Sequence, residues 1–484
     1  MPALPTPSPL IVAARSSERW DRASPVDLMQ LASDVGPAPM QVGAVLLLRP
    51  GREFDVPAAQ RLIGERIAAV PRLRQRLVRP PLGCGRPVWV DDARFDLRHH
   101  VGSVRCPAPG DPAALLEVAA AVLTRRLNPS RPLWAATFVT DLAGGAVAVV
   151  VVFHHVLADG IGGLAVLAHL VDGMPAAGPV PFPGAAPSSV ELAVDAWRGR
   201  WRAATGLPAL VRRLRHTLIE LGAGAGRVRR VPRTSLNRPT GPRRRLALAR
   251  ADLAAVHAAA HARGATVNDA VLSAVVGALH TLLACRGEHI GSLVVSVPVS
   301  SRAAASATRL GNHTGVMPVA LPTTVDPGQR LAAVAAVTRA RKNSVAGASA
   351  ALLGPVLRLL AAVGVLRRLI DRQRLVNTFV TNLRGPTGRL SLCGVTVDEI
   401  IPITTTTGNV TVAFAVLSYA GALAITIVVD PDRCPDVPAL ARAVQAELDT
   451  LAAAGRQQPC LDRDGPAPSA MRRTPAVRSG CHNA

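Results

Sequence analysis

The chain has few aromatic residues and almost no lysine. Aromatics make up 3% of its 484 residues, and 54 of its 55 basic residues are arginine, the exception being Lys342. Alanine, valine and leucine must therefore fill the hydrophobic core, for which an apolar content of 49% is ample. The formal net charge of +23 favours an anionic partner. Nucleic acid is not expected to be that partner, because the arginines are scattered and no aromatic-plus-basic motif accompanies them.

Cysteine pairs, a leader and long apolar runs are also missing. The seven cysteines show no CxxC spacing, which argues against a disulfide framework and against structural zinc. The N-terminus has no basic region followed by a long apolar run, so no secretory signal is expected. No uncharged window of about 18 apolar residues occurs, so no spanning helix is expected either. These absences predict a reduced, cytoplasmic protein.

Hydrophobic patterns alternate between strand and helix periods, which predicts an α/β protein with mixed sheets. Strands are expected at 41–48, 133–142, 146–155, 292–299, 410–421 and 422–430, and helices at 111–127, 164–173, 266–287 and 437–455. Regions rich in proline, glycine and arginine interrupt these patterns. We therefore expect a flexible tail at 1–20, a first domain at 21–172, a linker with a basic helix at 173–240, a second domain at 241–455 and a disordered tail at 456–484.

The stretch FHHVLADGIGG, residues 153–163, ends a hydrophobic run with two adjacent histidines. Successive side chains of a strand point to opposite faces, so His154 and His155 cannot both line one site unless the strand ends between them. One is expected to be reactive and the other to be hydrogen-bonded beneath the sheet. Asp159 is close enough to return to the strand end, and Gly160 and the following glycines allow a turn into a helix.

Several interpretations of this stretch compete. A zinc site needs a third ligand and the acidic residue of HExxH, which is absent, so no metal is expected. Gly160, Gly162 and Ala165 fit a GxGxxA dinucleotide fingerprint, but the chain then enters a proline-rich segment where a second strand is required. Two satisfied core histidines would leave the aspartate and glycines unexplained. A histidine general base at a strand end accounts for every residue. No GxSxG, GxxxxGK or SxxK motif supports a covalent serine mechanism or a P-loop.

The segment HHVLADG (154–160) matches HHxxxDG, the signature of the CoA-dependent acyltransferase superfamily. Over residues 24–455 the sequence resembles the bacterial wax ester synthase/diacylglycerol acyltransferase family in particular. Further blocks follow in the family's order: SPVDLMQL (24–31), PMQVGAVLLL (39–48), FDLRHHV (95–101), RPLW (131–134), LNRPTGPRRRLALA (236–249), TVNDAVL (266–272), LGN (310–312), VTNLRGP (380–386) and LSYAG (417–421). The ordered set is far more specific than any single block.

This resemblance implies a two-domain fold like that of chloramphenicol acetyltransferase, with an active-site tunnel between the domains. It implies a fatty acyl-CoA co-substrate, no cofactor, and diacylglycerol or a long-chain alcohol as acceptor, giving triacylglycerol or wax ester. His155 would be the general base and Asp159 the structural partner of the active loop, which His154 and Gly160 would shape.

Two further residues of the resemblance stand at the predicted start of a helix. Asn268 and Asp269 would lie near the tunnel and bind substrate, or they would only cap the helix. The element RPLW is expected to serve packing rather than chemistry.

Substrates of this kind are poorly soluble in water, so contact with a membrane is expected. The segments 208–221 and 354–376 are basic and amphipathic, which favours a peripheral position on the inner face of the plasma membrane or on lipid droplets. Each segment also fits an ordinary helix packed on the protein. Two other functions stay open: acylation of a specialised cell-envelope or secondary-metabolite alcohol, and lipid binding without catalysis. The intact HHxxxDG motif argues against the second.

Overall fold

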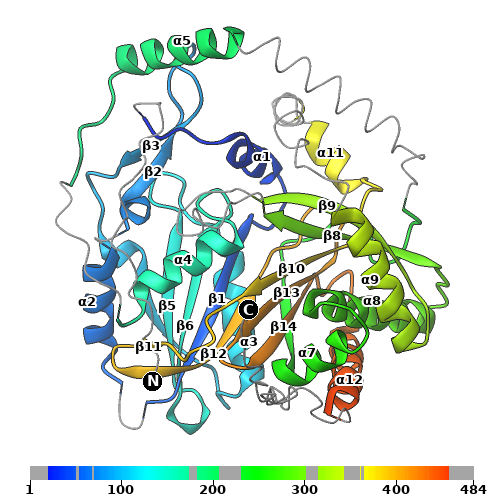
Figure 1. Ribbon diagram of the computed structural model, residues 1–484. Coiled ribbons are helices and arrows are strands. Elements are labelled where there is room, and N and C mark those ends of the chain that lie inside the picture. The colour runs from blue at the N-terminus through cyan, green and yellow to red at the C-terminus, as the bar shows by residue number, and fades with distance from the viewer. Residues whose placement is uncertain are drawn as a thin grey trace, which may run out of the picture.

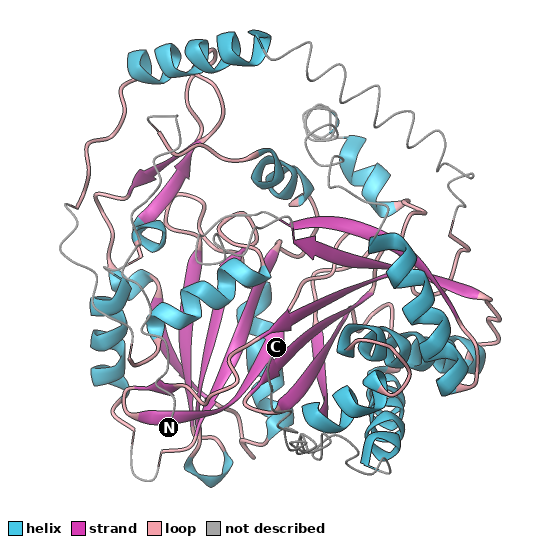
Figure 2. Ribbon diagram, viewed as in Figure 1, coloured by secondary structure: helices cyan, strands magenta, loops and turns pink. Residues whose placement is uncertain are grey.

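Two six-stranded sheets organise the computed structural model, and helices cover them (Figure 1 and Figure 2). The structure describes residues 20–50, 54–67, 70–173, 182–205, 231–300, 314–342, 360 and 365–456. The expected tails, the basic segment 208–221, the LGN block and most of 354–364 lie outside the described residues.

The first sheet has the strand order β11-β12-β1-β6-β5-β4. Its strands are β1 (Gln41–Leu48), β4 (Val101–Arg105), β5 (Trp134–Thr140), β6 (Val147–His154), β11 (Ser391–Leu392) and β12 (Val395–Ile403). The second sheet has the order β7-β14-β13-β10-β8-β9. Its strands are β7 (Arg245–Asp252), β8 (Ser292–Ser300), β9 (Thr314–Pro322), β10 (Thr378–Arg384), β13 (Val412–Tyr419) and β14 (Ala422–Val429). A separate ribbon pairs β2 (Gln75–Val78) with β3 (Val88–Asp91).

The described helices are α1 (Pro25–Ser33), α2 (Val56–Ile67), α3 (Pro112–Thr124), α4 (Gly160–Leu170), α5 (Ser189–Thr205), α7 (Leu253–His261), α8 (Val267–Cys285), α9 (Pro327–Lys342), α11 (Val365–Asp371) and α12 (Val437–Arg456). Short 3-10 turns lie at η1 (Pro71–Arg74), η2 (Leu97–His99) and η3 (Ala143–Gly145). Each strand and helix that the periodic patterns predict has a counterpart in the structure, with ends that differ by a few residues. The helix expected at 164–173 instead begins at Gly160, because Asp159 caps it.

Strands β11 and β12 of the C-terminal half extend the first sheet, and β12 makes the junction with the N-terminal half. β12 comes from the C-terminal half yet pairs antiparallel with β1 in the first sheet, with Leu46 opposite Ile400. β1 therefore has a partner on each side, β12 and β6, and no edge of it faces solvent. The division into domains at 21–172 and 241–455 did not include this crossing and stays a prediction.

Both faces of β6 are buried, which explains its uninterrupted apolar sequence. Val149, Val151 and Phe153 belong to the core cluster that includes residues of α2 and α4. Val150 and Val152 belong to the cluster that includes residues of α3. The strand therefore runs through the centre of the first half and carries its final histidines there.

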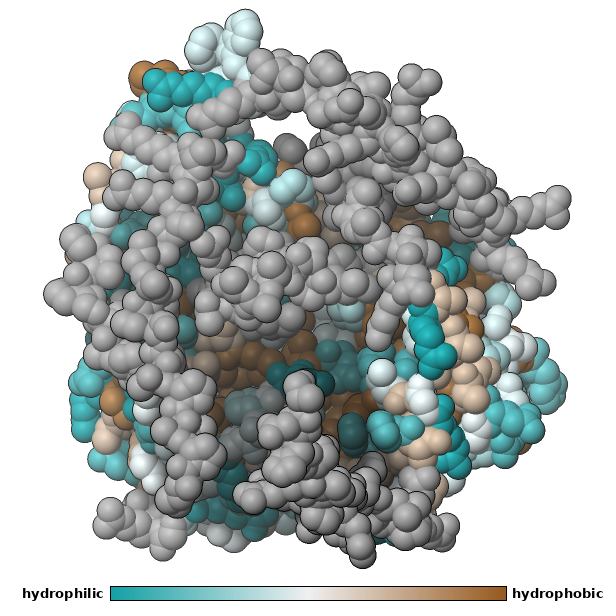
Figure 3. All heavy atoms as spheres, in the orientation of Figure 1, coloured by the Kyte–Doolittle hydropathy of each residue, from teal (hydrophilic) through white to brown (hydrophobic). Residues whose placement is uncertain are grey.

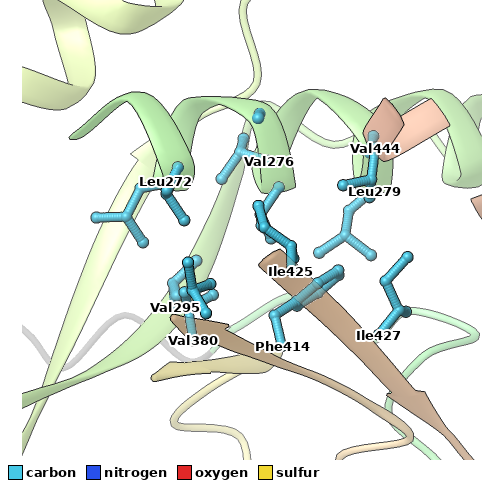
Figure 4. Close-up of a cluster of buried hydrophobic side chains, with 14 of the residues drawn as sticks. Leu272, Val276, Leu279, Val295, Val380, Phe414, Ile425, Ile427 and Val444 are labelled. Atoms are coloured by element: carbon cyan, nitrogen blue, oxygen red, sulfur yellow. The ribbon is translucent and has the colours of Figure 1, made fainter. Parts of the chain in front are cut away.

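The second sheet packs against α8. Leu272, Val276 and Leu279 of this helix meet side chains of the sheet that include Phe414 and Ile425 (Figure 4). The helix has the length and hydropathy of a membrane span, but 72% of that apolar window is buried inside the protein. Its apolar sequence is therefore that of a core helix.

Candidate active site

His154 is the last residue of β6 and His155 follows it directly, and the two side chains lie on opposite faces of the sheet. The backbone N–H of His154 donates to the Leu133 carbonyl at 2.9 Å, and that of His155 donates to the Met40 carbonyl at 2.8 Å. His154 follows Val152 on the face that α3 covers, whereas His155 lines a cavity on the side of α4. The alternation of a strand thus separates the two imidazoles, as the sequence predicts.

His154 is held from two sides and is only 6% exposed. Its Nδ1 accepts a hydrogen bond from the Val156 backbone N–H at 3.1 Å, and its Nε2 lies 3.3 Å from an oxygen of Asp34. Because Nδ1 is an acceptor, the ring hydrogen is on Nε2, which donates to the carboxylate. These bonds fix the ring and the turn that follows it.

Asp34, just after α1, is a part of the site that the sequence reasoning missed. Its carboxylate also accepts from the Met40 backbone N–H at 3.2 Å and pairs with Arg126 at 2.8 Å. Burial alone would raise the pKa of Asp34, but the hydrogen bond from His154 and the charge of Arg126 outweigh it, so the pKa is lowered. The sequence around Asp34, a loop with glycine and proline, contains no motif that predicts its hydrogen bond with His154.

Asp159 is the N-cap of α4 and is 2% exposed. One of its carboxylate oxygens accepts from the Gly162 backbone N–H at 2.9 Å. Gly160 lies against Leu383 of β10, since an added Cβ would come within 2.9 Å of both of its methyl carbons. An added Cβ at Gly163 would overlap the ring of Phe153. The motif's aspartate and glycines therefore place α4 tightly between β6 and β10.

The cavity beside His155 lies between the two sheets and has about 60 Å³ of internal space. Among its described lining residues, His155 is the one titratable group. The walls are otherwise apolar apart from the hydroxyls of Thr381 and Thr404. The full lining is Val42, Gly43, Ala44, Phe153, His155, Gly160, Gly163, Leu164, Leu167, Thr381, Leu383, Pro402, Ile403, Thr404, Ala415, Val416 and Leu417. The lining residues come from β1, α4, β10, β12 and β13, so the fold brings residues that are far apart in the sequence close to the imidazole of His155.

Asn268 and Asp269 lie in the first turn of α8, where Thr266 is the N-cap, as predicted. One carboxylate oxygen of Asp269 accepts from the backbone N–H and hydroxyl of Thr266, and the other accepts from the hydroxyl of Thr338 at 2.7 Å. The side-chain oxygen of Asn268 accepts from the Asn382 amide at 3.1 Å. Asp269 therefore ties α8 to α9, and Asn268 ties α8 to β10. Neither residue lines the cavity, and a role in substrate binding stays a prediction.

The blocks FDLRHHV and RPLW meet in a ring stack. His100 stacks on Phe95 at 5.2 Å and on Trp134 at 4.8 Å between ring centroids. Burial lowers the pKa of His100. The indole N–H of Trp134 donates to the Leu73 carbonyl at 2.7 Å. The RPLW element thus packs the first half of the chain.

Two family models cover most of the sequence. That of the wax ester synthase/diacylglycerol acyltransferase catalytic domain matches residues 23–271, and that of the WS/DGAT C-terminal domain matches residues 310–452. The chain belongs to the wax ester synthase/diacylglycerol acyltransferase family. The histidine motif lies in the first of these regions, and the walls from β10, β12 and β13 lie in the second.

Relatives within the family carry the same activity in their names. The probable diacylglycerol O-acyltransferase tgs1 of Mycobacterium tuberculosis (strain ATCC 25618 / H37Rv) is 31% identical over 448 residues, covering 88% of this chain and 94% of that one. The putative diacylglycerol O-acyltransferase Rv1760 of the same strain is 30% identical over 470 residues, or 91% of each chain. The wax ester synthase/diacylglycerol acyltransferase membership and these relatives confirm that the chain is an acyltransferase.

Solved structures share the fold. The wax ester synthase/diacylglycerol acyltransferase from Marinobacter aquaeolei VT8 aligns with a TM-score of 0.65 at 22% identity, covering 90% of this chain and all of that one. The first condensation domain of the calcium-dependent antibiotic synthetase aligns with a TM-score of 0.59 at 18% identity, covering 91% and 97%. They confirm the predicted mixed α/β, two-domain fold of the chloramphenicol acetyltransferase type.

Proposed function

We propose that the protein transfers a fatty acyl group from acyl-CoA to the hydroxyl of diacylglycerol, with His155 as the general base. The observation that carries the proposal is the position of His155 as the one titratable residue in the described lining of an apolar cavity between the two sheets. An apolar wall suits an acyl chain, and one imidazole suits the removal of one hydroxyl proton.

The reaction needs a single attack and no covalent enzyme intermediate. Neutral His155 accepts the proton of the acceptor hydroxyl as its oxygen bonds to the thioester carbonyl carbon. The tetrahedral intermediate then collapses, the carbon–sulfur bond breaks, and the CoA sulfur receives the proton from the imidazolium. Ester and free CoA are the products, and His155 returns to its neutral form. A base of this kind contributes a factor of about 10² to 10⁴ in rate.

The other motif residues position His155. Asp159 caps α4 through the Gly162 N–H, so we assign it to the shape of the loop rather than to proton transfer. His154 is hydrogen-bonded to Asp34 and to the Val156 backbone N–H, and it thereby holds the turn after β6 from the face of the sheet opposite the cavity. The cavity of about 60 Å³ is smaller than either substrate, so substrate binding requires it to widen.

Diacylglycerol is the acceptor that the names of the 30–31% identical relatives support. A long-chain alcohol is the second candidate, because the family includes wax ester synthases. Incubation with radiolabelled palmitoyl-CoA and either dioleoylglycerol or hexadecanol, followed by separation of the lipid products, distinguishes them. We expect triacylglycerol to form faster than wax ester.

No cofactor is needed for this chemistry, so excess EDTA should leave the rate of ester formation unchanged. CoA release that does not depend on either acceptor would contradict acyl transfer to these alcohols. If release then rises with a different added alcohol, a specialised acceptor is the substrate.

A further inference from the structure

An exposed apolar stripe runs along α5. Val190, Val194, Trp197 and Trp201 follow one another at steps of four, three and four residues, which places them on one face of the helix. Val190 is 72% exposed and each tryptophan is 58% exposed. The two indoles pack edge to face, with centroids 5.7 Å apart. In a chain with 3% aromatics, two exposed tryptophans on one helix face need a reason.

The opposite face of α5 is fixed to the protein, so the stripe points outward. Leu192 is buried against Cys84 and Val88, and Asp195 pairs with the buried Arg22 at 2.8 Å. Figure 1 shows α5 along the outer edge of the molecule, and Figure 3 shows apolar atoms exposed beside hydrophilic ones at that edge. The stripe is therefore not a surface that the described part of the fold covers.

A second exposed apolar pair lies on α11. Val365 is 42% exposed and Leu369 is 51% exposed, one turn apart on this helix, whose Leu366 is buried. α11 contacts α1, and Arg22, which holds α5, lies three residues before α1. Figure 1 shows α1 between α5 and α11 at the same end of the molecule. Because Asp34 at the end of α1 contacts His154, this is also the end of the molecule that holds the proposed base.

Basic residues accompany both apolar faces. α5 contains three arginines against two acidic residues, and α11 contains two against one. Asp195 and Asp371 pair with Arg22 and Arg367, while Arg198 and Arg368 have no carboxylate partner among the described residues. Tryptophan with arginine around an apolar stripe is the composition of a helix that lies in the surface of an anionic bilayer.

We propose that α5 and α11 together dock the protein on an anionic phospholipid surface. In this arrangement the tryptophans insert at the level of the headgroups, and the arginines remain in contact with the lipid phosphates. The end of the fold that holds His155 then faces the layer in which water-insoluble alcohols dissolve. Docking goes beyond acyl transfer and can be tested without it; only its benefit to catalysis rests on the proposed function.

Vesicle sedimentation and tryptophan fluorescence on the full chain test the proposal. Trp89 and Trp134 are buried and Trp20 is half-buried, so a blue shift on mixing reports on Trp197 and Trp201. We expect binding to vesicles of phosphatidylcholine with phosphatidylglycerol, quenching by lipids brominated on the acyl chain, and weaker binding at high salt. Vesicles of phosphatidylcholine alone should bind less protein.

The double variant W197S/W201S should lower the partition coefficient by a factor of about ten or more, because it removes the two largest inserted side chains. V365S/L369S should lower it independently of the tryptophans. Val325→Ser is the matched control, because Val325 is 77% exposed but lies outside both helices. Unchanged binding by both double variants would overturn the proposal, as would an emission spectrum that lipid does not shift.

Turnover of a short, water-soluble alcohol separates this proposal from the proposed function. If W197S/W201S loses vesicle binding but keeps that turnover, docking is supported and acyl transfer is intact. If the unmodified chain binds vesicles but esterifies no alcohol, docking stands and the proposed function fails.

Discussion

Asp34 contacts His154 on the face of the sheet that points away from the cavity. His154 is bound on both ring nitrogens, so its side chain cannot exchange places with that of His155 without breaking two hydrogen bonds. Asp34 in turn is bound by Arg126, whose side chain reaches from the segment after α3. A positioning network of three residues therefore lies on the face of the sheet opposite the proposed chemistry.

Replacing Asp34 tests this network through its pH dependence. The pKa of Asp34 is lowered in the folded protein, so the unfolded state binds the proton more readily as pH falls. Its contribution to stability is thus present above the unfolded pKa of about 3.9 and is lost as pH falls from there through the lower folded value. We expect Asp34→Asn to lower the free energy of unfolding by about 1–3 kcal/mol at pH 7, and by less near pH 3.

Urea denaturation of both proteins at the two pH values measures the difference. An Asp34→Asn effect that is equally large at pH 7 and pH 3 would show that the charge of Asp34 is not what stabilises the site.

Residue by residue, the sequence predicted the end of β6 to within one residue, the opposite orientation of the two histidines and a helix after the motif, but not the start of that helix at Gly160. These features depend on neighbours within ten residues, whose chemistry is visible in the motif. Asp34 was not predicted, because it lies 120 residues from His154 and only the fold brings them together. Asp269 takes part in the predicted helix cap, and both of its carboxylate oxygens are bound within the protein, while substrate binding by Asn268 and Asp269 stays a prediction.

At the scale of elements, β1 is packed so closely between its neighbouring strands that its third residue must be a glycine. Gly43 lies in register with Val152 of β6 and Ile403 of β12. An added Cβ at Gly43 would overlap the carbonyl oxygen of Val151. Gly43 also lines the cavity, so the spacing of the strands there sets the position of the wall that faces His155.

Gly43→Ala should therefore cost about 1–3 kcal/mol of unfolding free energy, as overpacking does in other cores, and should slow ester formation as well. Gly102→Ala is the matched control, because Gly102 lies in the edge strand β4 and an added Cβ there meets nothing within 4 Å. Guanidinium denaturation of both variants gives the comparison. Equal costs at the two positions would show that strand propensity, rather than the crowding at Gly43, is responsible.

Periodic patterns predicted the largely buried elements β1, β6 and α8, and they predicted α12, whose buried residues recur at helical spacing. They did not predict β10 or β12, although both build the cavity. The sequence of β12, VTVDEIIPI, mixes two acidic residues and a proline with its apolar residues, and the strand pairs with β1, which lies more than 340 residues away in the sequence. A strand that depends on contacts so distant in the sequence need not show a regular hydrophobic period of its own, so a local pattern does not predict it.

At the scale of the whole molecule, the crossing of β12 couples the two halves. Its neighbours in the sheet are β1 and β11, while β13 and β14 also contact it. Neither half keeps a complete core if the other unfolds, so unfolding is expected to be one cooperative transition. Ile400, 2% exposed in β12, belongs to the core cluster of the first half.

Ile400→Ala should lower the stability of the whole chain by about 2–5 kcal/mol without splitting the transition. Far-ultraviolet circular dichroism and intrinsic fluorescence, followed through the same denaturant titration, measure this. All the tryptophans lie in the first half of the chain, at 20, 89, 134, 197 and 201. A fluorescence change at lower denaturant concentration than the loss of ellipticity would contradict the coupling.

The most direct test of the central claim is the rate of CoA release from palmitoyl-CoA by the His155→Ala variant, with dioleoylglycerol supplied. If His155 is the base, the variant should lose a factor of about 10² to 10⁴ in rate while it keeps the unfolding midpoint of the unmodified protein. If the variant also folds as the unmodified protein does and binds acyl-CoA with the same affinity, the substitution has removed the chemical step alone. Acceptor-dependent release at an unchanged rate would mean that another group removes the hydroxyl proton, and the account of the HHxxxDG motif would be wrong.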